Sequence, residues 1–182
     1  MADNMIVVLA SDEASVFGVL SSRIHTHWSL ERGGTLEDRP RWSKSSVFDP
    51  FPFPDRSDAV ADIAERLDTT RRAAMADVPS LTMTALYNFV APIQQGALPP
   101  ELEAAATRAR AFIVAKLHDD LDIAVADAYG WGEEWRRAPL PPAEIVRRLV
   151  ALNATRAKEE AAGNIRWLRP DYQIPRFGSK KA

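Results

Sequence analysis

Two short stretches in the first third of the chain gather side chains that bind phosphate oxygens and base edges. Residues 21–28 read SSRIHTHW and residues 39–46 read RPRWSKSS. Guanidinium and ammonium groups neutralise phosphates or fork onto guanine, and hydroxyl groups bond to the nucleic-acid backbone or to bases. No helix or strand pattern requires Arg41, Ser43 and Lys44, so we interpret them as binding residues. Trp28 continues an apolar helical stripe, and we interpret it as a core residue.

Other kinds of chemistry have little support. The three histidines are His25, His27 and His118. Residues two apart on a helix do not face each other, so His25 and His27 do not make a metal site, and none is predicted. Residues 118–122 form an acidic cluster in which His118 and Asp122 share a helical face. We expect this cluster to be a solvated face with one ion pair along the helix.

Motifs for catalysis and cofactor binding are missing from the sequence. The chain has no Gly-x-Ser-x-Gly elbow, phosphate loop or dinucleotide fingerprint, and no carboxylates are spaced as an obvious acid–base pair. It has no cysteine, which excludes disulfides, thiolate catalysis and cysteine zinc sites. We therefore predict no catalytic residue and no metal, and a cytoplasmic location. No apolar run has a membrane-spanning length of roughly 18 residues, so no membrane partner is expected.

The charge is distributed unevenly along the chain, although its net value is only −2. Residues 57–135 carry 6 Lys and Arg against 13 Asp and Glu, for a net −7. Residues 136–182 carry 11 Lys and Arg against 4 Asp and Glu, for a net +7. A local field can steer a polyanion whatever the total charge, so the basic end is either a binding surface or simply a solvated tail.

The first part of the chain is predicted to mix strands with a helix. Residues 5–10 are an apolar, β-rich run that predicts a strand, and Ser11 is a candidate cap for a following helix that ends at Gly33 and Gly34. A second strand is expected at residues 45–48. Three alternating prolines at residues 50–54 predict an extended segment anchored by phenylalanines.

The period becomes helical from Ser57 onward. Four helices are predicted: one that ends before Pro79, one capped by Ser80 and kinked at Pro92, a long one from Pro99 to about Ala128, and one from about Ala143 to Gly163. The tail from Trp167 is predicted to be irregular. The fold class is therefore mainly α with a small α/β N-terminal segment, and the predicted domains are residues 1–56 and 57–182.

Several long strings resemble a known family of enzymes. They include LSSRIH at residues 20–25, RWSKS at 41–45, VFDPFPFP at 47–54, LTMTALYN at 81–88 and IRWLRP at 165–170. They resemble the end of the target recognition domain and the C-terminal helical domain of type IIL restriction–modification enzymes. These are class I DNA methyltransferases that use S-adenosylmethionine and fuse a nuclease to an adenine-specific methyltransferase.

The resemblance implies DNA recognition without methyl transfer. The family's glycine-rich cofactor loop, Asn-Pro-Pro-Tyr catalytic motif and nuclease motif are not in these residues. We expect the chain to be a fragment or split subunit that binds no cofactor itself and has double-stranded DNA as its partner. The DNA contacts that this implies come from Arg23, His25, His27, Arg41, Ser43, Lys44 and Ser45.

A second interpretation belongs to a different functional class. The helical part could be a docking module that binds a separate methyltransferase subunit and makes no direct contact with DNA. The acidic stretch at residues 57–135 suits a protein partner better than a polyanion.

Overall fold

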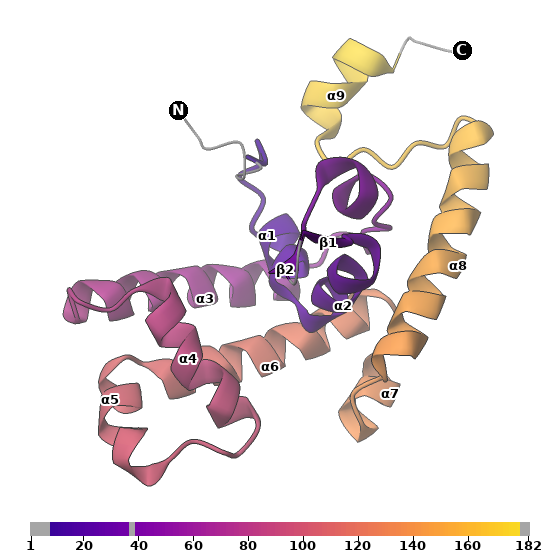
Figure 1. The fold of residues 1–182 in the computed structure, drawn as a ribbon. Helices are drawn as coiled ribbons and strands as arrows, with labels where there is room; N and C mark the ends of the chain where they lie inside the picture. The colour runs from indigo at the N-terminus through magenta and orange to yellow at the C-terminus, as the bar shows by residue number, and fades with distance from the viewer. Residues whose placement is uncertain (1–7, 37–38, 179–182) are drawn as a thin grey trace. The chain divides into compact units, whose positions relative to one another are not determined.

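The computed structural model describes residues 8–36 and 39–178, and the described chain is mainly α-helical, as predicted (Figure 1). It divides into two compact units that interleave along the sequence. Unit 1 consists of residues 1–12, 27–52 and 141–182, and unit 2 consists of residues 13–26 and 53–140. Helix α2 (Arg23–Arg32) begins in unit 2 and ends in unit 1. The predicted domain boundary after residue 56 stays a prediction.

Unit 2 is built around one long helix, α6, which packs against most of the others. Figure 1 shows α3 and α6 running side by side, with α4 next to α6. The helices of unit 2 other than α2 are α1 (Ala14–Ser21), α3 (Asp58–Asp77), α4 (Met83–Gln94), η2 (Pro100–Leu102, a 3₁₀ turn), α5 (Glu103–Arg108), α6 (Ala111–Ala128) and α7 (Gly132–Arg137).

Close packing of α1 on its neighbours depends on a glycine. A Cβ atom added at Gly18 would lie 2.8 Å from Val60 Cγ1, 3.0 Å from Ala64 Cβ and 3.2 Å from a Leu121 methyl group. The distance to Val60 is shorter than real Cβ atoms show and the other two are tight, so glycine lets α1 approach α3 and α6 this closely.

Local capping signals explain where two helices of unit 2 begin. Ser57 Oγ accepts the backbone N–H of Val60 at 3.4 Å and starts α3, which ends at Asp77 as the position of Pro79 predicts. Thr82 Oγ1 accepts the N–H of Ala85 at 3.1 Å and starts α4. The prediction that Ser80 caps this helix was wrong by two residues, because Ser80 lies in a turn after α3 that is closed by the Leu81 N–H donating to Val78 O at 2.8 Å.

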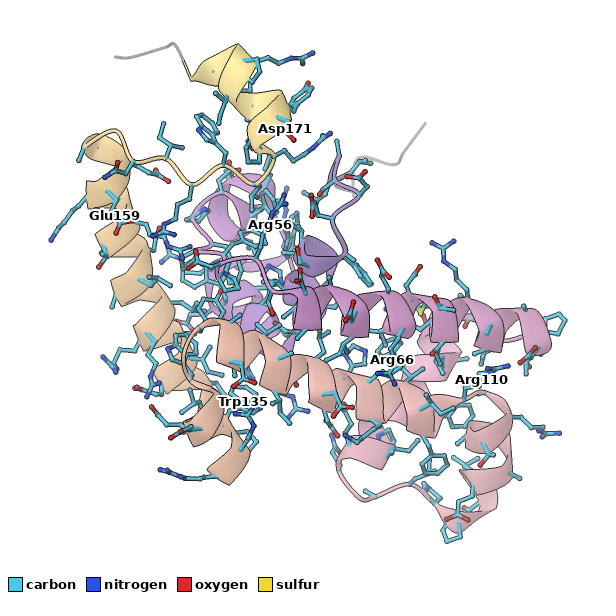
Figure 2. All side chains as sticks on the ribbon, turned by 180° about the vertical axis from the view of Figure 1, so that it is seen from behind. Arg56, Arg66, Arg110, Trp135, Glu159 and Asp171 are labelled. Atoms are coloured by element: carbon cyan, nitrogen blue, oxygen red, sulfur yellow. The ribbon has the colours of Figure 1, made fainter. Side chains whose placement is uncertain are left out.

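The long helix predicted from Pro99 to Ala128 is broken, so that prediction was wrong. Arg110 has a φ of 54°, in the left-handed region, and it separates α5 from α6. Its guanidinium group (Figure 2) pairs with Asp77, with Nε 3.0 Å from Oδ2. A tertiary ion pair therefore accompanies a backbone conformation that non-glycine residues rarely adopt.

A chain of polar side chains lies inside unit 2. Arg71 Nη1 donates to the Tyr87 hydroxyl oxygen at 3.1 Å, and the Tyr87 oxygen lies 2.6 Å from His118 Nε2. Arginine can only donate, so the tyrosine proton stays free for His118, whose Nε2 accepts it in the tautomer that carries its proton on Nδ1. Burial together with the Arg71 charge lowers the pKa of His118 to about 4, so the ring is neutral near pH 7.

Unit 1 contains the second half of α2 and five further elements: β1 (Thr35–Leu36), β2 (Arg39–Pro40), η1 (Lys44–Phe48, a π-helix), α8 (Pro142–Ala161) and α9 (Pro170–Phe177). The two short strands pair antiparallel, with Thr35 opposite Pro40. Helix α8 matches the predicted last helix, and it buries Ile145 and Leu149 completely.

Three features of unit 1 correct the predictions. Residues 45–48 form a π-helix and not a strand, because the N–H groups of Phe48 and Asp49 bond five residues back to Ser43 and Lys44. Helix α9 occupies part of the tail that was predicted to be irregular. Residues 5–7 of the predicted strand at residues 5–10 lie outside the described residues, and residues 8–10 are not in a strand. The α/β character predicted for the N-terminal segment is therefore not supported.

The predicted first helix is also two helices, α1 and α2. Ser22 lies between them with extended backbone angles, φ −78° and ψ 157°. Its Oγ donates to Val19 O at 2.7 Å and accepts the N–H of His25 at 3.3 Å. The same hydroxyl thus closes α1 and caps α2, which the apolar stripe running through both helices does not reveal.

Candidate nucleic-acid interface

The predicted residues Ser43, Lys44 and Ser45 lie together at the start of the π-helix η1. Ser43 Oγ accepts the backbone N–H of Ser46 at 3.2 Å, which makes Ser43 the cap of this element. The hydroxyl of Ser43 is thus engaged in local structure, and Ser43 itself is only partly exposed. Arg41, Lys44 and Ser45 are exposed around it, so the turn presents two cations and a hydroxyl group to solvent.

The inner side of this turn is held by aromatic packing within unit 1. Val47 is completely buried, and its carbonyl oxygen accepts a hydrogen bond from Trp28 Nε1 at 2.9 Å. Phe51, from the proline–phenylalanine segment, packs edge-on against Trp28 with ring centroids 5.9 Å apart. Trp28 is therefore a core residue, as predicted, and it fixes the segment that carries Lys44 and Ser45.

Lys44 has an intramolecular partner that a ligand can replace. Its Nζ lies 2.8 Å from Asp49 Oδ2, and the two side chains are 68% and 46% exposed. Ion pairs this exposed contribute roughly 0–1 kcal/mol to stability. Exchange of Asp49 for a phosphate oxygen therefore costs little.

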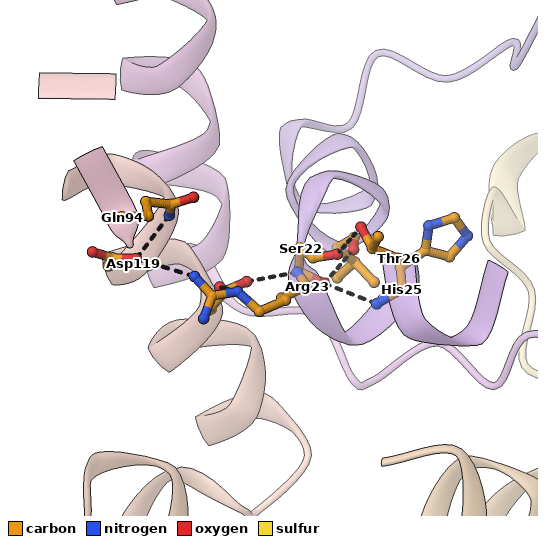
Figure 3. A network of polar contacts seen from close by, with 8 residues as sticks. Ser22, Arg23, His25, Thr26, Gln94 and Asp119 are labelled. Carbon is orange, nitrogen blue, oxygen red and sulfur yellow. Dashed lines mark hydrogen bonds and ion pairs between the residues drawn. The ribbon is translucent and has the colours of Figure 1, made fainter. Parts of the chain in front are cut away.

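Arg23 and His25 belong to the other unit, where Arg23 joins α2 to α6. Figure 3 shows Arg23 pointing at Asp119, which also accepts a hydrogen bond from Gln94. The backbone N–H of Arg23 donates to Asp122 Oδ1 at 2.7 Å, and its Nε lies 3.2 Å from Asp122 Oδ2. The Arg23 charge is thus largely used inside the fold.

His25 is 5% exposed, and its Nδ1 lies 3.1 Å from the carbonyl oxygen of Leu20. Burial lowers its pKa to about 4, so the ring is neutral near pH 7 and offers no positive charge. His27 is half-buried and belongs to unit 1. The predicted set is therefore divided, with Arg23 and His25 in unit 2 and the other five residues in unit 1.

The two units differ in charge. Unit 1 contains 13 Lys and Arg against 10 Asp and Glu, for a net +3. Unit 2 contains 10 Lys and Arg against 15 Asp and Glu, for a net −5. The field of unit 1 thus favours a polyanion more than that of unit 2 does, and unit 1 also carries the exposed residues Arg41 and Lys44.

The turn lies within a segment that matches a known protein family. Residues 1–55 match the family model of the MmeI target recognition domain. The match includes Arg41, Lys44 and Ser45 and ends at Asp55, so the helices from α3 onward lie outside it. No curated protein and no solved structure matches the chain.

Sequence reasoning missed the burial of Asp122. This carboxylate is 3% exposed, and burial raises its pKa to about 6. The expected solvated face with one helix ion pair is present only in part, at Lys116 and Asp120. The available signal was spacing, because His118, Asp122 and the fully buried Val125 lie on one helical face.

Two further kinds of site are not found in residues 8–36 and 39–178. No group of three or more His, Cys, Asp or Glu side chains there could hold a metal ion. In the same described residues, no helix is long and apolar enough to cross a bilayer.

Proposed function

We propose that this chain supplies DNA target recognition and helical support to an adenine-specific, S-adenosylmethionine-dependent DNA methyltransferase of a restriction–modification system, with the catalytic core in another segment or subunit. The observation that carries this proposal is the match of residues 1–55 to a target recognition domain, within which Arg41, Lys44 and Ser45 are exposed on a rigidly held turn. The predicted cytoplasmic location belongs to the same proposal.

In the proposed mechanism, the residues that contact DNA are different from those that hold the turn in place. Arg41 and Lys44 contact phosphates or guanine edges, and Ser45 adds a hydroxyl contact. Trp28 and Phe51 hold the turn from inside so that its side chains keep their positions. Arg23 and His25 support the join between α1 and α2 and do not carry most of the affinity. Phosphate contacts then make binding strongly dependent on salt.

The test is binding of the full chain to a mixed-sequence DNA duplex across a salt series. The variant R41Q/K44Q removes both exposed cations and keeps side chains of similar length. The matched control is R66Q/R72Q, which removes two arginines from α3 in unit 2, the unit with a net negative charge. Arg71 on the same helix is not changed, because it belongs to the polar chain with Tyr87 and His118. We expect salt-dependent binding by the wild type and the control. The slope of log K against log salt should fall by about two in R41Q/K44Q.

A second candidate function is a docking subunit without direct DNA contact, and the net −5 of unit 2 favours it. A folded wild-type chain that binds no DNA at low salt would refute the DNA-binding proposal and favour this one. Equal binding by the wild type and R41Q/K44Q would show that the DNA-contact surface does not lie at η1.

A further inference from the structure

Helix α9 is a short amphipathic helix with large apolar side chains in water. Tyr172, Ile174 and Phe177 are 43%, 49% and 47% exposed. These residues lie outside residues 1–55, and the function proposed above makes no use of them. A helix with this much exposed aromatic and aliphatic surface indicates a contact with another molecule.

Two arginines stack on the tyrosine of this helix. The guanidinium carbon of Arg176 lies 4.0 Å from the centroid of the Tyr172 ring, and that of Arg169 lies 4.9 Å from it. Arg176 also donates to the Tyr172 hydroxyl oxygen, and Arg169 donates to Ala10 O. The three residues are three and four apart, so they share one face of α9. Stacking fixes both guanidinium groups before any ligand arrives.

Three arginines of α8 and of the segment that follows it have carboxylate partners inside the chain. Arg147 and Arg148 both bond to Glu144 at 2.7 Å, and Arg166 Nε lies 3.4 Å from Glu159. Within the described residues, neither Arg169 nor Arg176 has a carboxylate partner. Residues 164–182 contain five Lys and Arg and one Asp, so the charge around α9 complements a polyanion.

We propose that the Arg169–Tyr172–Arg176 face of α9 is a second DNA-contact surface, which binds the sugar–phosphate backbone of a duplex. This inference rests on the function proposed above. Phosphate oxygens fit the two guanidinium groups, and the Tyr172 ring between them can pack against a deoxyribose. The contact adds affinity without reading sequence, since backbone contacts carry no direct sequence information.

Arg176 is the residue to change, because Arg169 also bonds to Ala10 within the fold. The full chain is measured with the same duplex and salt series as R176Q, R176K and the control R72Q, whose arginine is exposed on α3 of the acidic unit. We expect R176Q to lower the slope of log K against log salt by about one, with R72Q unchanged. R176K keeps the charge and should restore the slope, although it loses the guanidinium contact with the Tyr172 ring.

The outcomes separate this proposal from the first one. If R41Q/K44Q weakens binding but R176Q behaves like R72Q, the α9 contact is refuted and the proposed function stands. A wild-type chain that binds no DNA refutes both. If R176Q loses affinity with an unchanged salt slope, or if R176K fails to restore the slope, the phosphate contact is refuted. Circular dichroism of each variant confirms that the helical content is unchanged.

Discussion

Asp122 on α6 holds both the backbone and the side chain of Arg23 at the start of α2, although 99 residues separate them. The first N–H groups of a helix have no partner inside it. Ser22 Oγ satisfies the N–H of His25, and Asp122 satisfies that of Arg23. The start of α2 thus depends on a carboxylate from a distant helix, and several consequences of the fold can be measured.

Replacing Asp122 with alanine should lower the free energy of unfolding by about 3 kcal/mol at pH 7, because a buried N–H and a guanidinium group lose their shared partner. Chemical denaturation of the full chain measures this loss. The control is D119A, since the Arg23–Asp119 pair is 38% and 50% exposed and should contribute roughly 0–1 kcal/mol. Equal losses in the two variants would contradict a special role for Asp122.

Acid should destabilise the protein through its buried histidines. The pKa values of His25 and His118 are lowered from 6.5 to about 4, so the unfolded chain binds their protons more tightly than the folded chain does. Their contribution is complete above pH 6.5 and is lost as the pH falls toward 4. Asp122 acts in the opposite direction, because its pKa is raised from 3.8 to about 6 and its protonation favours the folded state in this range.

Denaturation at pH 7, 6, 5 and 4.5 tests these signs. The wild type should lose stability as the pH falls. H118Q keeps a hydrogen-bond acceptor for Tyr87 and should lose stability less steeply, whereas D122N should lose it more steeply. An H118Q profile that runs parallel to that of the wild type would show that His118 is not the group that titrates.

Two variants should measure the conformational strain of the left-handed backbone at Arg110. R110A and R110G both remove the ion pair to Asp77, but only glycine adopts a φ of 54° without strain. R110G should therefore be more stable than R110A by about 1 kcal/mol. Thermal unfolding of the pair gives the difference, and equal melting temperatures would mean that the α5–α6 break is not a strained position.

Removing the indole N–H of Trp28 should loosen the η1 turn. W28F keeps an aromatic ring against Phe51 but leaves Val47 O without its donor. The loss in stability should be about 1 kcal/mol. Hydrogen exchange at the N–H groups of Val47, Phe48 and Asp49 should become faster, while exchange in α6 changes only with global stability. Unchanged exchange in η1 would mean that Trp28 does not fix this turn.

Much of the fold could be predicted from local patterns. Spacing of apolar residues locates α3, α4 and α8, since each buries one stripe and its residues three and four apart must be apolar. Alternating prolines exclude a helix after Asp49, because each removes an N–H donor. The strings at residues 20–25 and 41–54 also carried the resemblance to a target recognition domain, which the match to residues 1–55 supports.

The sequence by itself thus determined the mainly helical fold, most helix positions and the segment that resembles a recognition domain. The tertiary structure decided which charged residues are used within the fold and which face solvent. Arg23 and Lys44 are both cations in the two basic stretches of the sequence. Arg23 pairs with Asp122, which is 3% exposed, whereas Lys44 pairs with the exposed Asp49. The break at Arg110 and the burial of Asp122 were also decided by the tertiary structure. Each depends on a partner more than 30 residues away, which local periodicity does not report.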